Sequence, residues 1–204
     1  MELLDYSRAN GLLTRYGIKS VKSEYVKSAK EALTFSKGSP IVLKALTDKA
    51  LHKTKSGLII LNLATEKEIS DAFSALSKRA EKFRPYRILA QKMASNGIEI
   101  IIGGKTDQQF GKMILIGLGG IYVETFKDVA MRTCPITKHD AESMLHQLKS
   151  SKVIAPDQKT ESMVADLILK TSRLFYDSRL TELDLNPIIL HDGTYDAVDL
   201  RLIQ

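Results

Sequence analysis

Short apolar runs alternate with periodic polar stretches along the whole chain. Five of the apolar runs are rich in β-branched residues and are bounded by Gly, Asn or Pro, which predicts strands. They cover residues 40–45, 58–63, 87–93, 98–103 and 112–116. Five other stretches repeat apolar residues every three to four positions, which predicts helices. They cover residues 5–16, 27–36, 65–83, 137–148 and 160–175. The pattern therefore indicates an α+β protein.

The stretch from Gln91 to Arg132 contains the most unusual part of this pattern. Its apolar runs are separated by turn-forming residues, so we expect consecutive antiparallel strands. The sequence Gly117-Leu118-Gly119-Gly120 follows the last of them. Glycines permit a positive φ or a close approach of the backbone, and side chains of both charges, including Arg132, follow the turn. Together these features indicate a site at Gly117–Gly120.

A hairpin near the C-terminus is the best candidate for a metal site. Residues 181–190 alternate strictly, so that Asp184 and Asn186 share one face. A turn at 191–194 leads to a returning strand, 195–202, which carries Asp199. In an antiparallel hairpin these three residues can converge, and their side-chain oxygens are the ligands that Mg²⁺ takes. The alternative is a polar strand face exposed to water.

Two basic residues in the first half each allow two interpretations. Lys44 is the only charge in an apolar strand. It is either an edge-strand lysine that discourages aggregation or an ammonium group that binds phosphate. His52 lies in the polar, basic loop 47–57. This loop is either a solvated surface loop or a cover for phosphate groups, in which His52 could accept a phosphoryl group.

Two further segments could contact a nucleotide. Gln91-Lys92-Met93 ends a predicted strand and can offer backbone amides to a purine edge, or it is an ordinary strand end. Glu99 lies among isoleucines in the next strand. Alternation favours a solvent-facing side chain for Glu99, and the alternative is contact with a ribose or a metal.

Composition excludes several classes of protein. The 204 residues carry a net charge of +6, but Lys and Arg are scattered and there is no tryptophan, which argues against nucleic-acid binding. No apolar run approaches the roughly 20 residues that cross a membrane, and the N-terminal sequence is not a secretory signal. A single cysteine, Cys134, excludes an internal disulfide. We therefore expect a cytoplasmic protein.

The ordered set of motifs resembles the ATP-grasp subunit or domain of ADP-forming acyl-CoA synthetases, relatives of the succinyl-CoA synthetase β subunit. The resemblance runs from about Leu12 to Leu202. It rests on PIVLKAL, LHKTKSG, QKMASNGIEIIIGG, DQQFGKMILIGLGGIYVETFKDVAMR, ELDLNPIIL and AVDLR. Single motifs such as GLGG are weak signals, whereas all of them in this order are a strong one.

The resemblance implies a role for each candidate residue. Lys44 would contact nucleotide phosphates, Gln91, Lys92 and Met93 would form the adenine-binding hinge, and Glu99 would hold the ribose. Gly119 and Gly120 would lie at the active site. Asn186 and Asp199, with Asp184 close by, would hold Mg²⁺ for ATP or ADP. The expected catalytic residues are His52, as phosphoryl acceptor, with Lys44 and Arg132.

The resemblance also implies an ATP-grasp fold in which two α+β subdomains clasp the nucleotide. The expected parts are a helical lead-in at 1–17, a small subdomain at 18–88 and a large subdomain at 89–204. The implied reaction is acyl-CoA + ADP + phosphate ⇌ acid + CoA + ATP. It would need a separate CoA-binding α subunit, in an expected α2β2 assembly. The alternatives are another ATP-grasp ligase that forms an acyl phosphate, or a non-catalytic nucleotide-binding regulatory subunit.

Overall fold

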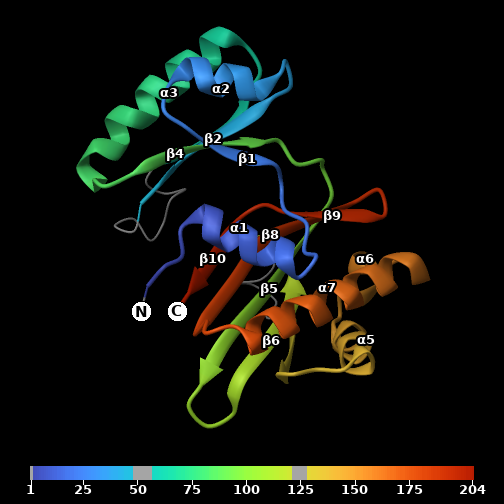
Figure 1. Cartoon of the computed structure of the whole chain (residues 1–204). Helices are drawn as coiled ribbons and strands as arrows, with labels where there is room; N and C mark the ends of the chain where they lie inside the picture. Colours follow the sequence, from blue (N-terminus) through green and yellow to red (C-terminus); the bar gives the residue numbers. More distant parts are fainter. Residues whose placement is uncertain (1, 48–56, 121–127) are drawn as a thin grey trace. The chain divides into compact units, whose positions relative to one another are not determined.

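The computed structural model describes residues 2–47, 57–120 and 128–204, and these form two compact units (Figure 1). One unit is the continuous stretch Val21–Met93, and the other combines Met1–Ser20 with Ala94–Gln204. The helix expected as a separate lead-in is therefore grouped with the C-terminal part of the chain. Among the described helices, none is both long and apolar enough to cross a membrane.

The unit Val21–Met93 contains a four-stranded sheet covered by two helices on one face. Its strands lie in the order β1-β4-β2-β3. The elements are β1 (Ser23–Val26), α2 (Ala29–Ser36), β2 (Ile41–Leu46), β3 (Ile59–Leu63), α3 (Glu66–Ala80), the 3-10 turn Glu81–Phe83 and β4 (Arg87–Lys92).

The core of this unit lies between the sheet and α2 and α3. Alternate residues of β2 and β4 pack against apolar residues of the two helices, as the three-to-four spacing in residues 65–83 predicts. The buried helical residues include Ile69, Ala72 and Leu76. Thr65 and Glu68 form a capping box at the start of α3. Helix α3 thus presents one apolar face to the sheet.

The second unit is built on a larger antiparallel sheet with helices α1 (Tyr6–Arg15), α5 (Lys138–Gln147), α6 (Ser151–Ile154) and α7 (Gln158–Asp177). Its strands lie in the order β10-β8-β5-β6-β7, and β9 also pairs with β8. They are β5 (Ile98–Asp107), β6 (Gly111–Leu118), β7 (Val129–Thr133), β8 (Glu182–His191), β9 (Thr194–Ala197) and β10 (Leu200–Ile203).

Three expectations from the sequence need correction. The strand at 87–92 pairs with β1 and β2, and it belongs to a different sheet from β5. The returning strand expected at 195–202 is divided into β9 and β10. The strict alternation expected over 181–190 breaks at Asn186 and Pro187. Before the break the buried residues are at odd positions, Leu183 and Leu185, and after it they are at even positions, Ile188 and Leu190.

A lysine joins the sheet of the larger unit to the end of its longest helix. The Lys112 ammonium group, from β6, donates hydrogen bonds to the carbonyl oxygens of Phe175, Tyr176 and Ser178, at 2.6 Å for Phe175. The last carbonyls of a helix have no partner within the helix, so a cation here both satisfies them and matches the helix dipole. Burial of the ammonium group lowers the pKa of Lys112.

Replacing this lysine is expected to destabilise the larger unit. Lys112→Met keeps the apolar stem but leaves the carbonyls at the end of α7 without their donor, which costs about 1–3 kcal/mol. The measurement is the urea midpoint of unfolding. Lys105→Met is the matched control, since Lys105 is an exposed lysine on the neighbouring strand. Equal midpoints for the two variants would contradict the assigned role of Lys112.

Candidate functional site

The larger sheet has an irregularity where β8 passes through Asn186 and Pro187. The pairing of β5 with β8 shifts register between Ile100 and Ile102, opposite Asn186 and Pro187. On the other side of β8, β9 ends at Ala197 and β10 begins at Leu200. Because an extra residue reverses the alternation of side chains, this shift keeps apolar residues on the helix-covered face at both ends of β8.

This irregular level brings the predicted metal ligands together. The Asn186 N–H donates to the Asp199 carbonyl oxygen at 3.2 Å, and the Val198 N–H donates to the Pro187 carbonyl oxygen at 3.0 Å. Asp184 precedes the shift on β8 and pairs with Arg201 of β10. The hairpin thus places Asp184 near Asp199 and the backbone of Asn186 opposite Asp199, and their role as metal ligands stays a prediction.

The electrostatics of Asp184 show how closely these acids are grouped. Burial raises the pKa of Asp184, and the negative charges of Asp199 and Glu182 raise it further, against an opposing effect of Arg201. Asp199 and Asp184 are both half-buried, whereas Asn186 is exposed. The two acids therefore do not lie on a polar strand face that is fully exposed to water, which was the alternative interpretation.

The donor set fits a magnesium ion that is partly coordinated by a ligand. Mg²⁺ prefers carboxylate and amide oxygens and usually keeps positions for phosphates and water. A cation would also relieve the repulsion between Asp184 and Asp199 that raises the pKa of Asp184. The described residues contain no cluster of three or more His, Cys, Asp or Glu side chains that could hold a metal by itself. The site would thus be completed by phosphate oxygens.

Sequence reasoning puts Glu182 on the same strand face as Asp184 and Asn186, but it gives neither Glu182 nor Arg201 a role in the site. Arg201 donates to the Glu182 carboxylate at 3.2 Å, and both residues influence the charge of Asp184. The sequence does indicate that both residues are near the site. Glu182 and Arg201 each lie two residues from a predicted ligand, and residues two apart in a strand share one face. These two residues form an ion pair at the side of the predicted metal ligands.

The glycine turn after β6 lies against Glu99. The Gly119 N–H donates to the Glu99 carbonyl oxygen at 2.7 Å, and a Cβ at Gly119 would lie 2.9 Å from that backbone. Gly120 has a φ of +69°, and a Cβ there would lie 3.3 Å from the Glu99 carboxylate. Both uses of glycine expected for this turn are confirmed. Glu99 itself is exposed.

The sheet register separates Arg132 from the predicted metal ligands. Met131 pairs with Leu115, Leu115 with Gly103, and Gly103 with Asp184, so Met131 and Asp184 share one face. Arg132 therefore lies on the opposite face, where its guanidinium group donates to side chains of α5. This geometry gives Arg132 a packing role and does not support the catalytic role predicted for it.

Asp128, another charge noted after the glycine turn, also has a structural partner. Its two carboxylate oxygens accept the N–H groups of Lys149 and Ser150, each at 2.8 Å. Burial alone would raise the pKa of Asp128, but these hydrogen bonds outweigh it and lower the pKa. The carboxylate thus fixes the turn that leads into α6.

In the smaller unit, Lys44 and Gln91 share the face of the sheet that the helices leave uncovered. Leu43 and Ala45 point into the core, so Lys44 points away from it. Lys44 pairs with Leu89 of β4, two residues before Gln91. It is 5% exposed and β2 is an inner strand, which rules out the edge-strand interpretation. Gln91 donates to Ser23 at 3.0 Å.

The hinge predicted at Gln91–Met93 cannot use all of the amides that the sequence suggested. The Lys92 N–H donates to the Lys22 carbonyl oxygen at 3.0 Å, and the Met93 N–H donates to the Pro40 carbonyl oxygen at 3.3 Å. The Lys92 ammonium group donates to the Ser36 carbonyl oxygen at the end of α2. A nucleotide bound here would have to be recognised by groups other than the Lys92 and Met93 amides and the Lys92 ammonium group.

Some predicted site residues lie outside the described residues. His52 and most of its basic loop belong to residues 48–56, and the charged residues Glu124 and Lys127 belong to 121–127. The role of His52 as a phosphoryl acceptor therefore stays a prediction.

Comparison with known proteins identifies the family. The family model described as an ATP-grasp domain matches residues 1–203. The β subunit of ADP-forming acetate–CoA ligase I from Pyrococcus furiosus is 32% identical over 206 residues, which cover 96% of this chain and 89% of that protein. Its name implies a partner subunit.

Solved structures agree with this match. Acetyl-coenzyme A synthetase 1 from Ca. Korarchaeum cryptofilum, solved with coenzyme A and Ca-AMPCP, superimposes with a TM-score of 0.90 at 32% identity over 99% of this chain and 93% of that chain. A second structure of that protein was solved with coenzyme A and Mg-AMPPCP, with its phosphohistidine segment pointing towards the nucleotide-binding site. It gives a TM-score of 0.83 at 31% identity and covers 98% of this chain and 92% of that chain. The chain therefore belongs to the ATP-grasp domain family and is homologous to the β subunits and domains of ADP-forming acyl-CoA synthetases.

Proposed function

We propose that this chain is the nucleotide-binding β subunit of an ADP-forming acyl-CoA synthetase. The reaction is acyl-CoA + ADP + phosphate ⇌ acid + CoA + ATP, with phosphoryl transfer through a phosphohistidine. The match to a named β subunit over 96% of this chain supports the assignment. The relative solved with a magnesium-bound nucleotide analogue and a phosphohistidine segment supports this route.

The observation in this chain that carries the proposal is the grouping of Asp184, Asn186 and Asp199 at one irregular level of the sheet. Their oxygens would hold Mg²⁺ on the phosphates of ATP or ADP, where the ion neutralises charge during phosphoryl transfer. Glu99, with Gly119 and Gly120 packed against it, would border the nucleotide in the same unit. Lys44 would supply a further positive charge for phosphate.

A partner subunit follows from this proposal. The CoA-binding site and the primary phosphohistidine would belong to an α chain, in an α2β2 assembly. The relative's designation as subunit β supports the need for such a partner. The single, buried Cys134 is compatible with the reducing cytoplasm, where we place the complex.

Turnover is expected only in the presence of the partner. The chain would be mixed with a matching α subunit, ATP, Mg²⁺, CoA and a panel of carboxylic acids, and ADP release would be followed. We expect acid- and CoA-dependent ADP release from the mixture and none from the chain alone. Acid-dependent ATP use without the α subunit would instead indicate an acyl phosphate-forming ligase, and nucleotide binding without turnover in the mixture a regulatory subunit.

Asp199→Asn should weaken nucleotide binding only when magnesium is present. Loss of one charged oxygen ligand is expected to raise the Kd of the magnesium–ATP complex on the order of tenfold. The measurement is calorimetric titration with ATP, in Mg²⁺ and in EDTA. Asp192→Asn is the matched control, because Asp192 lies in the turn of the same hairpin and is fully exposed there. An equal response of both variants to Mg²⁺ would refute the assignment of Asp199.

His52→Ala should separate binding from transfer. A histidine that accepts the phosphoryl group is needed for turnover but adds little to nucleotide affinity. We expect the Kd for ATP to change less than about twofold while turnover with the α subunit falls by at least about a hundredfold. His146→Ala, which alters an exposed histidine on α5, is the control. Full turnover of the His52 variant would show that this residue takes no part in transfer.

A further inference from the structure

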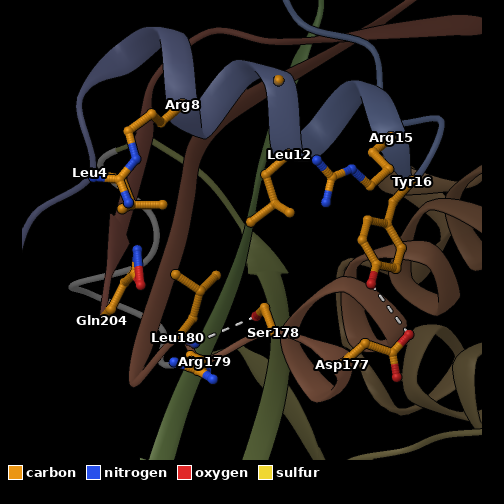
Figure 2. A pocket seen from close by; sticks show the side chains of 11 residues that line it. Leu4, Arg8, Leu12, Arg15, Tyr16, Asp177, Ser178, Arg179, Leu180 and Gln204 are labelled. Atoms are coloured by element: carbon orange, nitrogen blue, oxygen red, sulfur yellow. Dashed lines mark hydrogen bonds between the residues drawn. The ribbon is translucent and has the colours of Figure 1, made fainter.

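A pocket separate from the predicted metal ligands opens between α1 and the segment that follows α7 (Figure 2). Its volume of about 510 Å³ lies in the range of small-molecule sites. Helix α7 packs on the face of the sheet opposite Asp184, as a Cβ at Gly104 would meet the Phe175 ring at 2.9 Å. None of the residues proposed to bind nucleotide or magnesium lines this pocket.

Positive charge surrounds an apolar centre in this pocket. Figure 2 shows Leu12 and Leu180 between the guanidinium groups of Arg8 and Arg15 and that of Arg179. Arg8 forms an ion pair with Glu2 at 2.8 Å. Within the described part of the chain, no hydrogen bond or ion pair engages the side chain of Arg15 or Arg179. Two guanidinium groups are thus left to pair with a ligand.

The one acidic residue that lines the pocket is already engaged. The Tyr16 hydroxyl donates to the Asp177 carboxylate at 3.3 Å, which joins α1 to the end of α7 at one side of the pocket. Burial of the phenol, and then the charge of Asp177, raise the pKa of Tyr16, so this hydrogen bond is kept at neutral pH. With Arg8 paired to Glu2 and Asp177 bound to Tyr16, Arg15 and Arg179 are the guanidinium groups that remain for a ligand.

We propose that this pocket binds an organic acid with an apolar body. The carboxylate would pair with Arg15 or Arg179, because the planar guanidinium fork matches a carboxylate. The hydrocarbon part would cover the half-buried Leu12 beside the buried Leu180. An inorganic anion would leave the exposed part of Leu12 in water, and a neutral hydrocarbon would leave the arginines unpaired. The inference needs neither nucleotide nor turnover, so it stands apart from the proposed function.

The test uses hexanoate as the probe and the full chain without a partner. Hexanoate would be titrated by calorimetry, and the leucine methyl resonances would be followed by NMR to locate the binding. We expect saturable binding with shifts of the Leu12 and Leu180 methyl signals. The double variant Arg15→Gln, Arg179→Gln should bind hexanoate about tenfold or more weakly. Arg173→Gln, an exposed arginine of α7 that does not line the pocket, should bind as the parent does.

Two further probes decide between the proposal and its rivals. Hexan-1-ol has the same body without the charge, and inorganic phosphate has charge without the body; both should bind more weakly than hexanoate. Leu12→Ser, at a half-buried position, should weaken hexanoate binding and leave phosphate binding unchanged. The proposal is overturned if hexanol or phosphate binds as tightly as hexanoate, if the arginine variant keeps its affinity, or if the leucine methyl signals do not move.

Discussion

The register shift between β5 and β8 is the constraint on which the packing around the predicted metal site depends. β8 pairs with β5 along one side, where the register shifts beside Asn186 and Pro187, and with β9 and β10 along the other, where the register is kept across the gap between the two strands. A regular strand would turn Ile188 and Leu190 out of the core, whereas the shift keeps both buried. Asn186 is exposed at this level, and the unshifted register with β9 and β10 puts its backbone opposite Asp199. The shift on one side of β8 and the regular pairing on the other thus act at the same two residues, Asn186 and Pro187.

Local charge at this hairpin runs opposite to the charge of the chain. The protein carries a net charge of +6, but Asp184, Asp199 and Glu182 lie near enough together to raise the pKa of Asp184, with Arg201 as a partial counterion. Repulsion between these carboxylates costs stability unless a cation is bound. Carboxylates with perturbed pKa values are common at functional sites. Within the described residues this grouping, more than any single residue, distinguishes the hairpin from an ordinary polar strand face.

Local patterns predicted the elements well, and partners distant in the chain decided the rest. Helix α3 and its capping box could be predicted because Thr65, Glu68 and the spaced apolar residues are close in sequence. The break at Asn186 could not be predicted, because it is a shift in the pairing of β8 with Ile100 and Ile102 of β5, which lie far away in the chain. For the same reason the sequence put the strand at 87–92 in the wrong sheet.

The candidate site followed the same division. Oxygen ligands on one hairpin could be recognised from alternation and from the family motifs, and the positive φ of Gly120 from its neighbouring glycines. The face of the sheet on which Arg132 lies could not be predicted, because it depends on the strand pairings from β7 through β6 and β5 to β8. The occupied amides of Lys92 and Met93 likewise depend on Lys22 and Pro40, which sequence spacing does not place.

The arrangement of the two units along the chain has a consequence for synthesis on the ribosome. Val21–Met93 is continuous and contains its own sheet and core, so it can fold while later residues are still being added. The surrounding unit cannot, because β5 must wait for β8, and Leu3 bridges Ile203. Helix α1 is therefore made before Val21–Met93 but meets its neighbour β10 only after that unit is complete, which makes it a segment that nascent-chain chaperones would have to protect.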